Sequence, residues 1–386
     1  MTSTLLDLGR AVATAAPMLG LACGALPRFS AEHIGCRTTV DVNGGAAAEQ
    51  VQWVHIDDDE DRAFQNAWCA GVGPALYYAA PQPVGEEVVA NAGSAAATSL
   101  AEATSEEPVL DSLLVVAFNV HIGMADLDRF VADIRSGELT GAPVSHFVLL
   151  LQEAHREGMG VPEDEDLPAD VPHGSAMQER GRVTAVEWAQ ALGLNLIYVP
   201  SMRSGIGIDP PEDRGNAIMS TLPLDDVRGI ELPAGLQRRV AVVAELEGRT
   251  SAGNRWTLNV ASAHLDNASL SSPLASLGSV RARQASGLVR MLPSEGPLLV
   301  AGDFNTWLGQ EEERAWRIMR DEFPLPRQHQ TQPTAIRLGA GRIIDWMWFR
   351  GPAGWTIRDA RAPDWYGSDH YAVYAWVRIP PDGYEP

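Results

Sequence analysis

The chain has 386 residues, of which 45% are hydrophobic and 20% are charged. This length allows one large domain or two ordinary ones, and it is enough to bury a large core. The chain has 50 acidic residues against 29 basic ones, all of them arginine, and its formal net charge is −21. This excess argues against a protein whose main task is to coat nucleic acid or an anionic membrane, because both need a cationic surface. It leaves open an enzyme that acts on phosphates through a metal ion.

The first 22 residues have the pattern of an export signal. Arg10 is followed by the apolar stretch 11–22 and then by Cys23. A short apolar run after a positive residue and before a small residue is typical of a secretory signal. The Leu-Ala-Cys-Gly sequence also resembles a bacterial lipoprotein cleavage site, which implies a lipid and a membrane attachment at Cys23. We therefore expect an exported protein: periplasmic, attached to the cell envelope, or secreted. A cytoplasmic protein would keep residues 1–22.

The three cysteines all lie within the first 69 residues. If Cys23 is acylated, Cys36 and Cys69 remain as one candidate disulfide, as an oxidising compartment permits. No C-x-x-C motif or Cys/His cluster accompanies them, which argues against a zinc site.

Two segments precede the large domain. Residues 23–82 form a small segment with a strand-like stretch at 50–56 and a helix-like stretch over 61–79 that breaks near Gly71. Residues 83–110 are rich in Ala, Ser and Glu and predict a flexible linker.

The large domain, residues 111–380, alternates strand-like and helix-like stretches. Short apolar runs of strand length occur at 112–120, 145–153, 194–200, 216–221, 239–246, 256–265, 297–305, 342–349 and 370–379. Helix-period stretches occur at 125–136, 176–193, 279–292 and 311–323. Several strands are apolar on both faces, so both faces are covered. The pattern predicts an α+β fold of two packed sheets flanked by helices.

Five of the predicted strands begin or end in a polar cluster: FNVH, LLQEAH, SAHLDN, AGDFNTW and GSDHY. A sixth, IIDWMWF, carries Asp345 inside an apolar run. Polar groups at matching strand ends can converge on one rim of a sheet sandwich, where a rigid scaffold presents binding residues.

These motifs and their order resemble the endonuclease/exonuclease/phosphatase superfamily of metal-dependent phosphoesterases, in particular its deoxyribonuclease-like and sphingomyelinase-like branches. The resemblance covers about residues 112–379. The matching residues are Asn119, Glu153, Asn216, His264, Asp303, Asn305, Asp345, Asp369 and His370. It implies a four-layer α/β/β/α sandwich of two mostly antiparallel sheets, with the site at one edge of the sheets.

The resemblance implies a Mg²⁺ or Mn²⁺ site. A divalent cation neutralises the phosphate and stabilises charge on the leaving oxygen, and Mg²⁺ takes one or two carboxylates from the protein. Glu153 is the expected ligand, Asn119 supplies an amide group nearby, and Asp369 orients the site or holds a second metal.

The remaining motif residues match the expected catalytic groups. Asp303 orients or deprotonates the attacking water, and Asn305 holds the phosphate or that water. Asp345 fixes the tautomer of His370 and favours its imidazolium form, which can bind a phosphate oxygen. His264 donates to the phosphoryl oxygen from the opposite side.

Substrate contacts are expected from Asn216, from Arg214 just before it, and from Trp307 beside the GDFN motif. One position departs from the pattern: many abasic-site nucleases have an acidic residue two positions after the first-motif asparagine, and here that residue is His121. This departure argues against abasic-site repair.

We therefore predict a monomeric divalent-metal-dependent phosphoesterase that cleaves a phosphodiester in a nucleic acid, nucleotide or lipid headgroup by attack of an activated water. No stable nucleic-acid complex is expected. Two alternatives remain: a catalytically silent exported lipoprotein that uses the sandwich as a binding module, and an intracellular repair nuclease.

Overall fold

The computed structural model of the chain describes residues 35–44, 47–81, 108–177, 179–267, 274–307, 312–323, 331–337 and 339–381. The predicted signal, Cys23 and most of the predicted linker lie outside these residues. Across the described part of the chain, no helix is both long and apolar enough to span a membrane.

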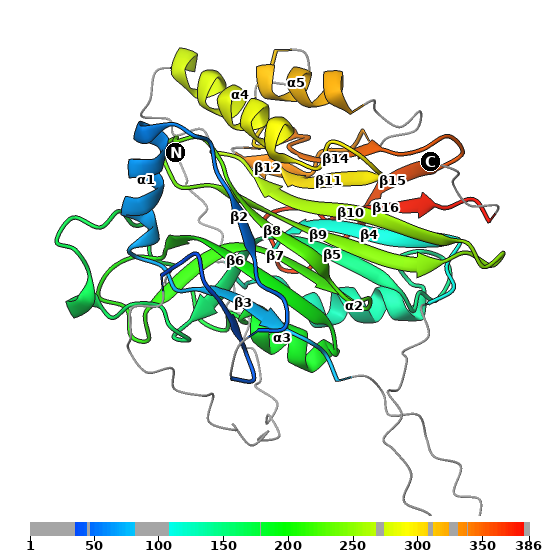
Figure 1. Cartoon of the computed structure of the whole chain (residues 1–386), viewed down its shortest axis with the longest axis horizontal. Coiled ribbons are helices and arrows are strands. Elements are labelled where there is room, and N and C mark those ends of the chain that lie inside the picture. Colours follow the sequence, from blue (N-terminus) through cyan, green and yellow to red (C-terminus); the bar gives the residue numbers. More distant parts are fainter. Residues whose placement is uncertain are drawn as a thin grey trace, which may run out of the picture.

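Two mixed β-sheets are stacked face to face (Figure 1). The larger sheet has the strand order β1 (Thr39–Asp41), β3 (Ala75–Tyr78), β6 (Asn195–Arg203), β7 (Glu212–Ser220), β5 (Phe147–Glu157), β4 (Ser112–Asn119), β16 (Val373–Arg378), β15 (Thr356–Arg361). The smaller has the order β14 (Asp345–Arg350), β11 (Leu298–Asp303), β10 (Arg255–His264), β9 (Val240–Arg249), β8 (Asp225–Glu231), β2 (Gln52–Val54). A separate hairpin consists of β12 (Ala335–Arg337) and β13 (Ala340–Arg342).

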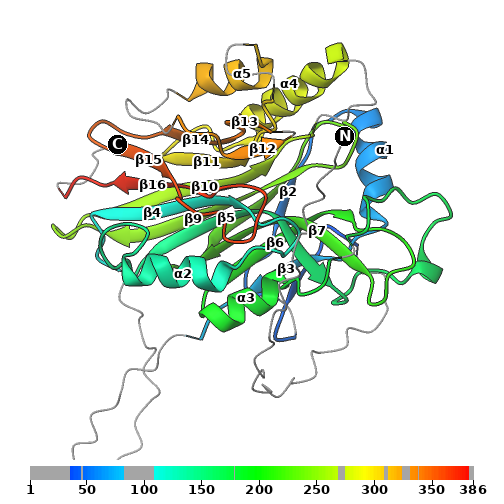
Figure 2. The same ribbon diagram turned by 180° about the vertical axis from the view of Figure 1, so that it is seen from behind.

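Helices cover the outer face of each sheet, which confirms the predicted four-layer sandwich. The helices α2 (Leu127–Ser136) and α3 (Ala185–Leu192) pack on the eight-stranded sheet, as Figure 2 also shows. The helices α4 (Leu274–Met291) and α5 (Arg314–Glu322) lie over the six-stranded sheet (Figure 1).

Alternate residues of the central strands enter different cores, which explains why these strands are apolar on both faces. In β4, Val115 and Ala117 face the other sheet, whereas Val116 and Phe118 face the helices. A strand alternates its side chains between its two faces, so both sets must be apolar when both faces are covered.

The described part of the N-terminal segment, residues 35–81, contributes to both sheets. Strands β1 and β3 extend the eight-stranded sheet, and β2 pairs with β8 at the edge of the six-stranded one. Helix α1 (Asp59–Cys69) joins β2 to β3, and a disulfide links Cys36 to Cys69.

Three parts of the structure differ from the sequence prediction. The helix-like stretch 61–79 is helical only to Cys69, and its end forms β3, because Gly71, Gly73 and Pro74 interrupt the helix. The stretch 176–193 is helical only in α3, which begins at a capping box of Thr184 and Glu187. Strands β8 and β15 carry several charged residues and lacked the apolar runs by which the other strands were predicted.

Candidate active site

Strand register brings three of the predicted catalytic residues side by side. The parallel strands β10 and β11 both end at the same edge, so His264 pairs with Asp303. Strand β14 runs antiparallel to β11 and begins at that edge, so Asp345 pairs with Asp303 from the other side. The larger sheet places Asn119, the last residue of β4, at the same edge.

Asp303 lies at the centre of the site and is 2% exposed. Its Oδ1 accepts from the backbone N–H of Asn305 at 2.8 Å. Its Oδ2 accepts from the amide of Asn119 and from the amide of Asn305, each at 3.3 Å. Nε2 of His264 lies 3.4 Å from the same oxygen, and Nε2 of His370 lies 3.8 Å from it.

Burial raises the pKa of Asp303 to about 7, with further increases from the charges of Asp345 and Glu153. The charge of His370 and the backbone N–H of Asn305 act in the opposite direction. A carboxyl group with a pKa near neutrality is suited to accept a proton from water at physiological pH.

Asn305 is fixed by a tight turn, with a φ of 52°. Its amide nitrogen donates to the backbone oxygen of Leu265 at 3.0 Å, and its Oδ1 accepts from the indole nitrogen of Trp307 at 3.1 Å. Trp307 therefore lies directly against the site, as expected, and its N–H holds the amide of Asn305.

His370 and Asp345 form the predicted pair. Nδ1 of His370 lies 2.9 and 3.1 Å from the two carboxylate oxygens of Asp345. Burial alone would lower the pKa of His370, but the charges of Asp345 and Asp303 outweigh burial and raise it to about 10. The ring is therefore an imidazolium at neutral pH, and its Nε2–H faces Asp303.

His264, in contrast to His370, is uncharged. Burial lowers its pKa well below the usual value, and the nearby charges of Arg239, His370 and Arg214 lower it further. His264 is therefore a neutral imidazole with one N–H, so the two histidines beside Asp303 differ by one proton.

Glu153 occupies a bulge in β5. The pairing of β5 with β7 shifts between Leu151 and Ala154, and Glu153 itself has a φ of 53°. Among the described residues, none forms a hydrogen bond or ion pair with its carboxylate, although Arg214 is close enough to interact with its charge. Burial lowers the pKa of Arg214, while the charge of Glu153 raises it.

Two further expected site residues do not contact Asp303 directly among the contacts of the described residues. Asp369 has a side chain that is 60% exposed, and one of its carboxylate oxygens lies 3.8 Å from Nδ1 of His121. Its charge contributes to the raised pKa of His370. Asn216 is 2% exposed, and its amide nitrogen donates to the backbone oxygens of Val240 and Ser262 in the other sheet. This amide nitrogen thus bonds inside the protein, between the sheets.

Sequence reasoning missed two supporting residues. The hydroxyl oxygen of Thr334 accepts from the backbone N–H groups of Ile344 and Asp345 and so fixes the start of β14. The hydroxyl of Ser368 donates to the backbone oxygen of Asn119 at 2.6 Å. Ser368 belongs to the GSDHY motif and could have been found there, whereas nothing near Thr334 in the sequence marks its role.

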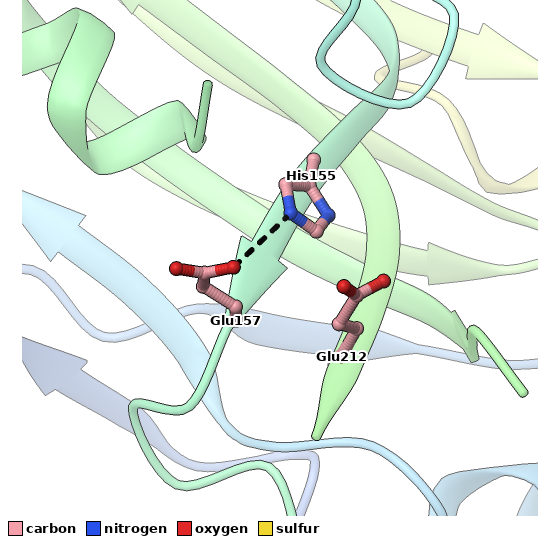
Figure 3. Close-up of side chains that lie close together, drawn as sticks. All are labelled: His155, Glu157 and Glu212. Atoms are coloured by element: carbon pink, nitrogen blue, oxygen red, sulfur yellow. Dashed lines mark ion pairs between the residues drawn. The ribbon is translucent and has the colours of Figure 1, made fainter. Parts of the chain in front are cut away.

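A second cluster of ligand-type side chains lies further along β5. His155, Glu157 and Glu212 (Figure 3) place one ligand atom each within 4.8 Å of one another. The same holds for Asp303, Asp345 and His370. However, Arg182 donates to both oxygens of Glu212, with Nη1 2.8 Å from Oε2, and the same Nη1 lies 3.5 Å from Nδ1 of His155. A guanidinium group therefore already neutralises part of this cluster.

Residues 116–370 match the Endonuclease/Exonuclease/phosphatase family. None of the curated protein sequences compared with the chain matches it.

Three solved structures illustrate the similarity. An endonuclease/exonuclease/phosphatase protein from Beutenbergia cavernae is 20% identical, with a TM-score of 0.48 over 70% of this chain and 72% of that one. Sphingomyelinase C from Streptomyces griseocarneus is 14% identical, with a TM-score of 0.40 over 69% of this chain and 99% of that one. A beta toxin from Staphylococcus aureus with bound magnesium ions is 12% identical, with a TM-score of 0.42 over 69% of this chain and 99% of that one.

The family match extends over more than half of the chain, from β4 to the loop before β16, and it includes every site residue from Asn119 to His370. The chain therefore belongs to the endonuclease/exonuclease/phosphatase family of phosphoester hydrolases.

Proposed function

We propose that the protein is a Mg²⁺- or Mn²⁺-dependent phosphoesterase that hydrolyses a phosphodiester by attack of water. The observation that carries this proposal is the environment of Asp303, a buried carboxyl group whose Oδ2 lies 3.4 Å from Nε2 of His264 and 3.8 Å from Nε2 of His370. Burial raises the pKa of this carboxyl group, and the charges of Asp345 and Asp303 raise the pKa of His370. Such a site offers a proton acceptor and a fixed positive charge within 4 Å of each other.

The residues at this edge fit a hard divalent cation. Glu153 offers a half-buried carboxylate without a hydrogen-bond or ion-pair partner among the described residues, and Asn119 offers an amide oxygen that accepts only from the backbone of His121. Oxygen donors of this kind suit Mg²⁺ and Mn²⁺. These two residues would hold the ion. A bound ion would neutralise phosphate charge and stabilise the leaving oxygen.

The Asp303–Asp345–His370 cluster is less suited to a metal. Both oxygens of Asp345 already face Nδ1 of His370, and the protonated ring repels a cation. We assign proton handling and charge stabilisation to this cluster. Asp303 accepts a proton from the attacking water, while Nε2–H of His370 binds an anionic phosphate oxygen. Asn305 holds Asp303 through its backbone N–H.

The proposal is tested by hydrolysis of bis(4-nitrophenyl) phosphate with added Mg²⁺ or Mn²⁺. Glu153→Gln is expected to lose both Mn²⁺ binding, measured by calorimetry, and metal-dependent hydrolysis. Glu157→Gln removes a carboxylate four residues further along the same strand and is expected to retain both. Wild-type protein that binds no metal and hydrolyses neither this diester nor any natural phosphodiester would favour the silent binding module.

The substrate class is resolved by a second assay on plasmid DNA, RNA, nucleotides and sphingomyelin. Arg214 and Trp307 lie against the site and are the proposed substrate contacts, so Arg214→Gln should raise KM more than it lowers kcat. Given the net charge of −21, we expect no tight complex with long polyanions.

We further propose that the protein is exported. The disulfide between Cys36 and Cys69 supports this proposal, because disulfides persist mainly in oxidising compartments. Mass spectrometry of the mature N-terminus checks it: a chain that begins at a lipidated Cys23 would support envelope attachment, and a chain that retains residues 1–22 would contradict export.

A further inference from the structure

Three of the buried polar side chains in the mainly apolar interior between the two sheets lie close to the candidate active site. Gln152 in β5 and Asn216 in β7 belong to the eight-stranded sheet, and Ser262 in β10 belongs to the six-stranded sheet. Each is at most 2% exposed. Polar groups so placed need a reason, because burying them costs free energy unless their hydrogen bonds are made.

Hydrogen bonds from these side chains cross the gap between the sheets. Nε2 of Gln152 donates to Oγ of Ser262 at 2.9 Å, and that Oγ donates to the backbone oxygen of Leu151 at 2.9 Å. The amide nitrogen of Asn216 donates across the gap to the backbone oxygens of Val240 at 2.8 Å and Ser262 at 3.3 Å.

The contacts lie directly beneath the candidate active site. Gln152 immediately precedes Glu153 in β5, and Ser262 lies two residues before His264 in β10. The side chain of Gln152 lies close to the backbone of Gly302 in β11. A Cβ atom on Gly302 would lie 3.0 Å from Nε2 of Gln152 and 1.9 Å from the backbone oxygen of Ala263. A side chain at the position before Asp303 would therefore collide with this arrangement.

These contacts are not optimal for stability. The carbonyl oxygen of Gln152 is buried without a hydrogen-bond partner among the described residues. A buried acceptor left unpaired costs free energy, whereas apolar groups of the same shape can replace a hydrogen-bonded pair at little cost. Directional bonds do provide what apolar contacts lack, namely a fixed relative position of the two sheets.

We propose that Gln152, Ser262 and Asn216 form an inter-sheet clamp that sets the distance between Glu153 on one sheet and Asp303 and His264 on the other. The clamp residues are positioning residues, and their effect on rate rests on the proposed phosphoesterase function. The metal-side groups Glu153 and Asn119 both belong to the larger sheet, whereas Asp303 belongs to the smaller one. The clamp therefore aligns two halves of the site that no single sheet holds together.

Ser262→Ala tests the clamp, with Ser220→Ala as the matched control. Both serines are 0% exposed. Ser220 is the last residue of β7, and its hydroxyl oxygen accepts a hydrogen bond from the backbone N–H of Leu222. Ser262→Ala is expected to lower kcat at least tenfold, because misplacing catalytic groups by about 1 Å can cost on the order of 10²-fold. KM and Mn²⁺ affinity should stay unchanged, and Ser262→Thr, which keeps the hydroxyl, should restore part of the rate.

Two further measurements decide the outcome. In an Asp303→Asn background, Ser262→Ala should lower the residual rate little further, because the group that it positions is gone. Hydrogen exchange should speed up at residues 150–156 and 260–266 in Ser262→Ala but not in Ser220→Ala. Equal rate losses in the two alanine variants, or unchanged exchange at these residues, would overturn the clamp. If the wild type hydrolyses no phosphoester, the proposed function fails, and hydrogen exchange still decides the clamp.

Discussion

The described residues include two histidine–carboxylate clusters that look alike in composition and differ in charge. The first consists of Asp303, Asp345 and His370, and the second of His155, Glu157 and Glu212 (Figure 3). Burial by itself favours a lower pKa for both His370 and His155. With all neighbouring groups included, the pKa of His370 is raised to about 10 and that of His155 is lowered to about 4.

The difference arises from what faces each ring. Nδ1 of His370 faces the carboxylate of Asp345, with no arginine between them. Nδ1 of His155 faces Arg182, whose guanidinium lowers the pKa of His155 further and takes up the charge of Glu212. Composition therefore does not decide whether such a cluster can act on a phosphate. An imidazolium free to bind an anion requires a carboxylate partner and no competing cation.

The largest expected effect is a difference in kcat between variants of the two histidines. His370→Gln removes a positive charge beside Asp303 and is expected to lower kcat on the order of 10²- to 10³-fold. His155→Gln is expected to leave kcat unchanged, because no predicted reacting group contacts His155. Steady-state kinetics on bis(4-nitrophenyl) phosphate measures both, and equal losses in the two variants would remove the functional distinction between the clusters.

The site was predictable from the sequence where its chemistry lies in short motifs at strand ends. Asp303 and Asn305 are two residues apart and bond directly, and Asp345 and His370 meet as expected. The second cluster was not predicted, because only the pairing of β5 with β7 places Glu212 opposite Glu157. The contact of Arg182 with Glu212 spans a further 30 residues of sequence.

Long-range contacts also explain what the sequence left open in the fold. The apolar runs predict two packed sheets flanked by helices, and the family resemblance implies the four-layer sandwich. The sequence predicts a helix-like stretch over 61–79, whereas its end forms β3. The disulfide could be proposed only as a candidate, because 33 residues separate its cysteines and only the packing of α1 brings them to a Cα–Cα distance of 5.5 Å.

The second expected effect concerns stability. Arg182→Gln leaves Glu212, which is 4% exposed, without its cation, and breaking a buried pair in this way costs about 3–5 kcal/mol. Urea denaturation should show this loss. The same change should raise the pKa of His155, measured by NMR, because it removes the guanidinium. A pKa that stays at about 4 would mean that burial alone sets the charge of this ring.

The third effect is the dependence of stability on pH, which should have opposite signs for the two histidines. The folded pKa of His370 is raised from 6.5 to about 10, so its contribution to stability is present below pH 6.5 and is lost as pH rises to 10. The folded pKa of His155 is lowered from 6.5 to about 4, so its contribution is present above pH 6.5 and is lost as pH falls to 4.

Thermal unfolding across pH 4–10 checks these signs. His370→Gln should flatten the alkaline side of the Tm profile, and His155→Gln should flatten the acidic side. Identical profiles for the two variants would show that the two rings do not differ in charge.

The smallest expected effect comes from Glu157→Gln. The carboxylate of Glu157 is 49% exposed, and its oxygen lies 3.9 Å from Nε2 of His155. Because the pKa of His155 is about 4, this ring is neutral at pH 7 and the contact is not an ion pair there. The substitution should change the free energy of unfolding by no more than about 0.5 kcal/mol at pH 7, as exposed substitutions usually do. A clear loss of stability at pH 7 would mean that His155 is charged, and would make the two clusters electrostatically equivalent.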